Sequence, residues 1–201
     1  MPNLTEQYSP DRLVDRAIIH DVMMKWCRAI DRLDLDAIRA VFHADAHDDH
    51  GPYRGGVDGL IDWVRERHKT ITFSMHQLSN MLIEFATPDL ALVETTVCSI
   101  QRYTADGKKS LAQLSGGKLG APGRESDLMG SSRYVDRFER RHGEWRIARR
   151  TVIAGWRRIV DVDADAPVMG SDWTVQRRDL TDFIFRERAE LGLAKPSPLS
   201  R

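Results

Sequence analysis

The fold prediction for this chain rests on the segment FSMHQLSNMLIEF, residues 73–85. Apolar side chains recur at every second position, which is the pattern of a β-strand with one face turned toward a core. The apolar positions are Phe73, Met75, Met81, Ile83 and Phe85. His76 and Asn80 fall on the opposite face of the same strand. We therefore predict a long strand that carries a titratable imidazole near its middle.

Helical periodicity precedes this strand, and further strand periodicity follows it. The predicted helices cover residues 11–33, 34–42 and 57–69, with a loop over residues 47–56. The predicted strands cover residues 71–86, 90–103, 131–141 and 144–160. Helices followed by a meander of long antiparallel strands are typical of an α+β domain in which the sheet curls around the helices.

The domain is expected to cover residues 1–160, followed by a linker, a helix and a tail over residues 161–201. The segment 105–130, between two predicted strands, is long and rich in glycine, as lids over binding sites often are. The final helix, RDLTDFIFRERAEL, is amphipathic. We expect it to pack against a neighbouring subunit or to cover the domain, because its apolar residues would otherwise be exposed.

Composition and charge restrict the classes of partner. Hydrophobic residues make up 41% of the 201 residues and charged residues 30%, as in soluble globular proteins. The 30 basic and 30 acidic side chains cancel, so the chain has no net field to attract nucleic acid or an anionic membrane. No apolar run is long enough to span a membrane, and the N-terminal segment lacks the apolar core of a signal peptide. We therefore expect a cytoplasmic protein whose partner is a small molecule or another protein.

Asp31 and His76 are the residues best suited to acid–base chemistry. Asp31 lies at the edge of the buried face of the first predicted helix. Alone, it could be an exposed carboxylate near the helix end, and His76 could be a hydrogen-bonded core histidine. Together they could form a general base, in which the aspartate fixes the histidine tautomer and stabilises the imidazolium. Their proximity is a hypothesis.

The segment HADAHDDH, residues 43–50, crowds histidines and aspartates together. We predict a short strand and loop here. On such a segment His43, His47 and His50 form neither the helical H-x-x-x-H arrangement of a zinc site nor a recognised facial triad. We therefore expect no metal, and a solvated loop with His50 at the rim of a pocket. The segment SGGKLGAPG, residues 115–123, lacks the lysine spacing and the following helix of a phosphate-binding loop. No cofactor is expected.

Four segments together resemble the SnoaL-like branch of the nuclear transport factor 2-like (NTF2-like) superfamily. They are WCRAID (26–31), DDHGPYRG (48–55), SMHQLSN (74–80) and RYVDRFERRHGEWRIARR (133–150). The resemblance covers about residues 11–160. It implies a cone-shaped α+β fold, in which a curved antiparallel sheet wraps around N-terminal helices and encloses a deep pocket.

The resemblance also implies a set of site residues. Scytalone dehydratases, bile-acid 7α-dehydratases and hexachlorocyclohexane dehydrochlorinases of this superfamily use an aspartate–histidine dyad, which Asp31 and His76 match. Arg150 matches an arginine in the last strand of the dehydrochlorinases, where it would stabilise a departing anion. Arg149 would take that place if the register slipped by one residue. The remaining candidates are Tyr53 as a phenol donor, and Trp26, Asn80 and His50 as substrate-binding residues.

We therefore expect a cofactor-independent lyase, with His76 as general base, that acts on an apolar aromatic or polycyclic molecule. The elimination would be a dehydration or a related reaction, including release of formaldehyde from an aromatic diol. An isomerase or a polyketide cyclase would need similar groups. The alternative is a non-catalytic protein, either a ligand-binding module or a small structural subunit of a ring-hydroxylating dioxygenase. We expect the chain to form a homo-oligomer, a dimer or a trimer.

Overall fold

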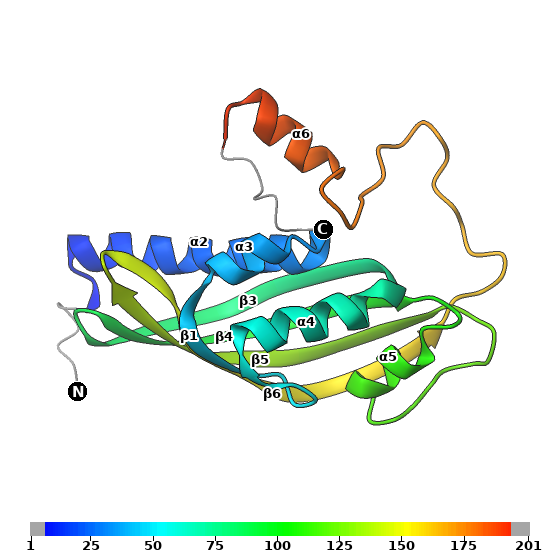
Figure 1. Ribbon diagram of the computed structural model, residues 1–201, viewed down its shortest axis with the longest axis horizontal. Coiled ribbons are helices and arrows are strands. Elements are labelled where there is room, and N and C mark those ends of the chain that lie inside the picture. The colour runs from blue at the N-terminus through cyan, green and yellow to red at the C-terminus, as the bar shows by residue number, and fades with distance from the viewer. Residues whose placement is uncertain (1–6, 194–201) are drawn as a thin grey trace.

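Six strands form one curved sheet in the computed structural model, which describes residues 7–193 (Figure 1). The strands are β1 (Phe42–Asp49), β2 (Arg54–Gly56), β3 (Ile71–Thr87), β4 (Leu90–Tyr103), β5 (Ser126–Arg141) and β6 (Glu144–Asp161). Their order in the sheet is β2-β1-β6-β5-β4-β3, in which β1 runs parallel to β6 and the other neighbours are antiparallel. The helices are α2 (Pro10–Arg32), α3 (Leu35–Ala40), α4 (Val57–Arg67), the short 3-10 helix η1 (His68–Thr70), α5 (Lys108–Leu114) and α6 (Phe183–Glu190). The predicted α+β class is confirmed.

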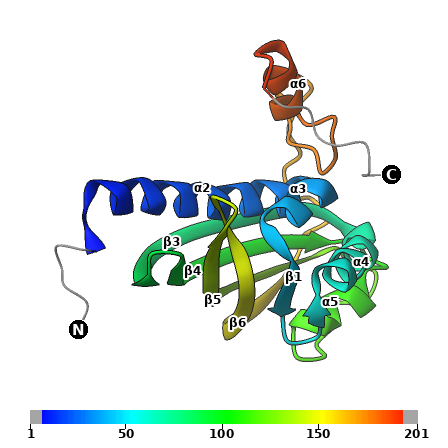
Figure 2. The same ribbon diagram turned by 60° about the vertical axis from the view of Figure 1, so that its left-hand side comes forward.

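Helix α2 lies across one face of the curved sheet (Figures 1 and 2). It begins after Ser9, whose side chain accepts a hydrogen bond from the backbone N–H of Arg12. It ends where Leu33 adopts a left-handed conformation. Its apolar face packs into the main core, and the buried apolar residues are Ile19, Val22, Met23, Trp26, Cys27, Ala29 and Ile30. This packing fixes the last turn of α2, which carries Asp31, against the inner face of the sheet.

Strand β3 changes its inward face at a β-bulge. Ser74 is buried and His76 half-buried before the bulge, whereas Ile83 and Phe85 are buried after it. The pairing of β3 with β4 shifts by one residue at Asn80, which has a φ of 46°. The prediction of one continuous alternation over residues 73–85 is therefore wrong. Even-numbered residues face the interior before the bulge and odd-numbered residues face it afterwards, so His76 lies on the core side of the strand.

Two connections differ from their predictions. The expected loop over residues 47–56 contains the end of β1 and the short strand β2, because residues 47–49 pair with both β2 and β6. The expected lid over residues 105–130 contains α5 and the first residues of β5. Leu111 of α5 is fully buried in a cluster with Tyr103 and Leu128. Helix α5 is therefore part of the folded domain, and residues 115–125 form the irregular connection to β5.

The C-terminal segment folds back over the end of α2. The guanidinium of Arg178 donates hydrogen bonds to the carbonyl oxygens of Ile30 and Asp31, both at 3.2 Å, and of Ile71 at 2.8 Å. The carbonyl groups of Ile30 and Asp31 lie at the negative end of α2, where a cation is favourable. Arg178 therefore ties the C-terminal segment both to α2 and to the start of β3.

Helix α6 follows this anchor and lies above α2 and α3 (Figure 1). Asp182, its N-cap residue, lies 3.7 Å from Nε of Arg32, and Phe185 is buried. Phe183 and Leu191 remain exposed. The C-terminal segment thus contacts the end of α2, and the expectation that residues 161–191 cover the cone or pack against a second subunit stays a prediction. None of the described helices has the length and apolar character needed to cross a membrane.

Candidate active site

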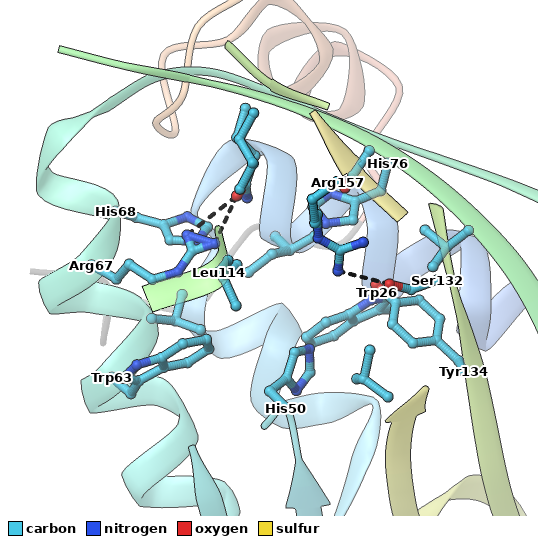
Figure 3. A pocket seen from close by; sticks show the side chains of 17 residues that line it. Trp26, His50, Trp63, Arg67, His68, His76, Leu114, Ser132, Tyr134 and Arg157 are labelled. Atoms are coloured by element: carbon cyan, nitrogen blue, oxygen red, sulfur yellow. Dashed lines mark hydrogen bonds between the residues drawn. The ribbon is translucent and has the colours of Figure 1, made fainter. Parts of the chain in front are cut away.

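A cavity lies between the last turns of α2 and α4 and the inner face of the sheet (Figure 3). Its volume is about 70 Å³, several times the roughly 10–15 Å³ that one water molecule needs. Aromatic and histidine rings form much of its wall, namely Trp26, His50, Trp63, His68, His76 and Tyr134. The sequence-predicted residues that line it are therefore Trp26, His50 and His76. A mixed lining of this kind suits a small molecule with an apolar body and a few polar groups.

His76 lines the cavity and forms an acid–base pair with Asp31, which lies behind it and is not among the lining residues. Oδ1 of Asp31 lies 2.7 Å from Nδ1 of His76, and Oδ2 accepts the backbone N–H of His76 at 2.9 Å. The hydroxyl of Ser74 donates to Oδ1 at 2.8 Å. Burial disfavours the charged carboxylate, but the hydrogen bonds from His76 and Ser74 outweigh it and hold the pKa of Asp31 below its ordinary value. An ionised Asp31 therefore fixes the proton of His76 on Nδ1 and leaves Nε2 as the acceptor.

Asp48 and His50 form a second pair of the same type. Nδ1 of His50 is hydrogen-bonded to Oδ1 of Asp48, which is fully buried at the end of β1. Oδ2 of Asp48 is buried without a hydrogen-bond partner in the described part of the chain. The ring of His50 contacts those of Trp26 and Tyr134, with centroid distances of 6.1 and 6.4 Å. Two histidines, each held by its own buried aspartate, thus line one cavity.

Arg150 faces the interior, and Arg149 is exposed on the opposite face of β6. The guanidinium of Arg150 donates to both carboxylate oxygens of Asp136, at 2.8 and 2.7 Å. Burial disfavours its charge, but this ion pair outweighs burial and raises the pKa of Arg150. The guanidinium lies 4.7 Å from the ring centroid of Trp26 and 4.2 Å from that of Tyr134. Arg150 therefore supports the aromatic wall from behind and is not among the residues that line the cavity.

Tyr53 and Asn80 also lie outside the cavity lining. The hydroxyl of Tyr53 donates to the carbonyl oxygen of Gly56, and its ring stacks on Trp63 with a centroid distance of 6.0 Å. Tyr53 therefore positions the Trp63 ring. Asn80 is exposed because the β-bulge turns it away from the face that carries His76. Both residues were expected to contact substrate, but neither is among the residues that line the cavity.

The three histidines of the segment 43–50 point to different surroundings. Nε2 of His43 donates to the carbonyl oxygen of Glu139 at 2.9 Å, whereas His47 is exposed and His50 lines the cavity. Within residues 7–193, no group of three histidine, cysteine, aspartate or glutamate side chains is arranged to hold a metal ion. A shift in the register of β1 between Phe42 and His47 separates His43 from His47, and the alternation of the strand separates His47 from His50.

The chain thus has a curved sheet around an N-terminal helix and an aspartate–histidine pair at an internal cavity. Its sequence also matches a family model. The model of the SnoaL-like domain matches residues 11–151. The chain belongs to the SnoaL-like family. No curated protein is similar enough in sequence to be counted as a match.

Solved structures share the fold of this SnoaL-like protein at low sequence identity. A candidate scytalone dehydratase from Novosphingobium aromaticivorans is 22% identical, with a TM-score of 0.60, over 79% of this chain and 96% of the other. A hexachlorocyclohexane dehydrochlorinase from Novosphingobium barchaimii is 18% identical, with a TM-score of 0.61, over 80% and 98%. A candidate aromatic ring hydroxylase from Novosphingobium aromaticivorans is 20% identical, with a TM-score of 0.59, over 77% and 96%. These similarities establish the NTF2-like fold.

Several lining residues of this SnoaL-like domain were not predicted from the sequence. They are Trp63, Arg67, His68, Gln101, Ser132, Tyr134 and Arg157. One signal was available for Arg67, because it continues the apolar stripe of its helix, three residues after Val64 and seven after Leu60. A second signal was the spacing of Asp48 and His50, since residues two apart on a strand share one face.

Proposed function

We propose that this protein is a cofactor-independent lyase that removes a proton from a carbon atom of a compact aromatic or other apolar molecule and expels a small group from the neighbouring carbon. The observation that carries the proposal is the contact of 2.7 Å between Asp31 and His76 in the wall of the cavity. Aspartate–histidine pairs of this geometry act as general bases in enzymes. The small cavity favours a compact substrate over a polycyclic one.

In the proposed reaction, Nε2 of His76 accepts the proton from carbon. The electron pair of the broken C–H bond forms the C=C bond as the bond to the leaving group breaks. The imidazolium that forms on His76 is stabilised by the ionised Asp31, which lies against its Nδ1–H. Ser74 and the backbone N–H of His76 hold the carboxylate in place, so little reorganisation is needed when charge develops.

His50 is proposed as the acid that protonates a departing hydroxyl group. Protonated His50 would donate from Nε2, so that the leaving oxygen departs as water and His50 becomes neutral. Asp48 would hold the ring of His50 in place, because its Oδ1 is hydrogen-bonded to Nδ1 of that ring. Transfer of a proton from His76 to His50 through solvent would restore both residues for the next turnover. This sequence of steps needs proton transfers alone and no redox cofactor.

The fold is consistent with this proposal, because the structurally similar proteins include a candidate dehydratase and a dehydrochlorinase. Sequence identities of 22% and 18% indicate a shared fold but do not establish a shared activity. The proposal therefore depends on the two aspartate–histidine pairs and on the cavity that they share.

A substrate panel tests the proposal. Single-ring aromatic alcohols, diols and β-chloro analogues would be incubated with the protein, and alkene, water-loss and formaldehyde products measured by mass spectrometry. We expect elimination from at least one member and its loss in His76→Ala. His20→Ala is the matched control, because His20 is exposed on α2 and lies outside the cavity. Tight binding without turnover across the panel would instead support a ligand-binding module.

A further inference from the structure

Arg67 is a buried cation whose hydrogen-bond partners within residues 7–193 are neutral. Its side chain is 4% exposed, in the last turn of α4. The guanidinium donates to Oε1 of Gln101 at 2.7 and 3.2 Å and to the hydroxyl of Tyr103 at 3.0 Å, and both partners are neutral. Nε of Arg67 is buried without a hydrogen-bond partner in the part of the chain that the structure describes. Buried charges in proteins are normally paired, so this arrangement calls for an external anion.

Arg157 brings a second guanidinium to the same cavity from β6 (Figure 3). It donates to the carbonyl oxygens of Ser131 and Trp156, at 2.9 and 3.0 Å, and to the hydroxyl of Ser132 at 2.8 Å. These partners are neutral as well. The charges of Arg67 and Arg157 repel each other, and together with burial this repulsion lowers the pKa of Arg67. An anion placed between the two guanidinium groups would relieve that repulsion.

His68 adds a neutral N–H donor next to Arg67. Its Nδ1 lies 2.8 Å from Nη2 of Arg178. A guanidinium can only donate, so Nδ1 is the acceptor and the ring hydrogen is on Nε2. Burial, together with the charges of Arg67 and Arg178, holds the pKa of His68 well below its ordinary value, so the ring is neutral at neutral pH. His68 lines the cavity and is fixed as a donor at Nε2.

Three carboxylates near the cavity each bind another group through at least one oxygen. Asp31 binds His76 and Ser74, Asp48 binds His50, and Asp136 binds Arg150. Arg67, His68 and Arg157 therefore present donors and positive charge to the cavity, whose wall also contains the aromatic rings and His76.

We infer that the cavity binds an anionic substrate by its carboxylate group, between Arg67 and Arg157 and with His68 as a third donor. The substrate class of the proposed lyase would then be a small aromatic carboxylate, and this part of the inference depends on the proposed function. Guanidinium groups bind planar carboxylates through two parallel hydrogen bonds, which fixes the orientation of the ligand as well as its position. A carboxylate held between them would keep the apolar body of the molecule in the same cavity as His76.

The test compares the binding of benzoate with that of its neutral isostere benzamide by titration calorimetry. Benzoate is expected to bind the wild-type protein about tenfold more tightly or better, because charge-assisted hydrogen bonds to carboxylate are worth more than neutral ones. Arg67→Gln and Arg157→Gln should each abolish that preference. Arg67→Lys should weaken it, because lysine keeps the charge but lacks the two parallel N–H donors of the guanidinium group. Arg149→Gln is the control, since Arg149 is exposed outside the cavity.

Equal binding of benzoate and benzamide to the wild-type protein, or no binding of benzoate, would overturn the inference. Retention of the preference in a folded Arg157→Gln variant would do the same, even if Arg67→Gln does not fold. The outcome is separable from the proposed activity. Benzoate binding through Arg67 without elimination from any substrate would count against the lyase alone, whereas turnover of neutral substrates with no carboxylate preference would count against the anion site alone.

Discussion

Nδ1 of His76 lies 2.7 Å from Oδ1 of Asp31, and this contact joins the last turn of α2 to the middle of β3 across 45 residues of sequence. It also explains why a largely buried helix carries an acidic residue in its last turn. Asp31 lies at the negative end of the helix, which is unfavourable for a carboxylate. Three donors from Ser74 and His76 compensate for that position.

The proposed acid is tested by the dependence on the leaving group. His50→Gln should lower the rate of elimination from a hydroxylated substrate by about a hundredfold or more, because the departing oxygen then receives no proton. The same variant should have little effect on a chlorinated analogue, since chloride leaves without protonation. Steady-state kinetics on the matched pair of substrates measures both rates. Equal losses on the two substrates would show that His50 acts in some other way.

The buried neutral His68 predicts a loss of stability at mildly acidic pH. Its pKa is lower in the folded protein than the ordinary value of 6.5, so the unfolded chain binds more protons below that pH. The contribution of His68 to the free energy of unfolding is therefore constant above about pH 6.5 and falls as the pH decreases, by up to about 1.4 kcal/mol per pH unit.

Urea unfolding of wild-type protein, His68→Gln and His20→Gln between about pH 7.5 and pH 5 measures this effect. Glutamine keeps an acceptor for Arg178, so His68→Gln should flatten the acid loss, whereas the exposed His20→Gln should leave it unchanged. An identical slope in wild-type protein and His68→Gln would refute the assignment of a buried neutral His68.

The β-bulge on β3 predicts an unusual pattern of substitution effects. Asn80→Val should destabilise the protein by about 1–2 kcal/mol, because a β-branched residue is strained at a positive φ. Asn80→Gly should be close to neutral. Ser79→Val, at the neighbouring exposed position with ordinary strand geometry, should be neutral or slightly stabilising. Equal effects of valine at both positions, measured by urea unfolding, would contradict the bulge.

The C-terminal segment is predicted to stabilise the end of α2. Truncation after Val160 removes Arg178 and Phe185, which leaves the carbonyl groups of Ile30 and Asp31 without these donors and exposes apolar surface. We expect a lower melting temperature and a change in oligomeric state or solubility, measured by thermal unfolding and size-exclusion chromatography. Arg178→Gln should reproduce part of the thermal effect. An equally soluble and stable truncated protein with an unchanged elution volume would contradict this role.

The sequence predicted the elements with long, regular periodicity and missed features that depend on single residues. The bounds of the helix around Trp26 and of the strands β3 and β4 lie close to those predicted from the sequence. The bulge at Asn80 shifts the register of β3 by one residue. It reverses which residues of the strand face inward, and the amino-acid composition of the strand gives no sign of this change. The short helix α5 was missed because its burial depends on Leu111 meeting residues from β4 and β5.

Part of the candidate site could also be predicted from the sequence. The rest could not, because it depends on contacts between segments that lie far apart in the sequence. Asp31 and His76 were paired through the family resemblance, and the structure places them in contact. Arg150 is in the expected strand and faces inward, but its partner Asp136 comes from the neighbouring strand β5, and pairing between strands cannot be read from one segment. The same applies to Arg67, whose neutral partners lie on β4.

A double-mutant cycle measures whether Asp31 and His76 act as one general base. On a substrate from the panel, kcat/KM would be measured for wild-type protein, His76→Ala, Asp31→Asn and the double variant, with thermal unfolding as a check on folding. Each single change should lower kcat/KM by about 10²- to 10⁴-fold, and the double variant should be little worse than His76→Ala, because the two groups act as a unit. Full activity of folded His76→Ala, or losses that multiply in the double variant, would contradict the account.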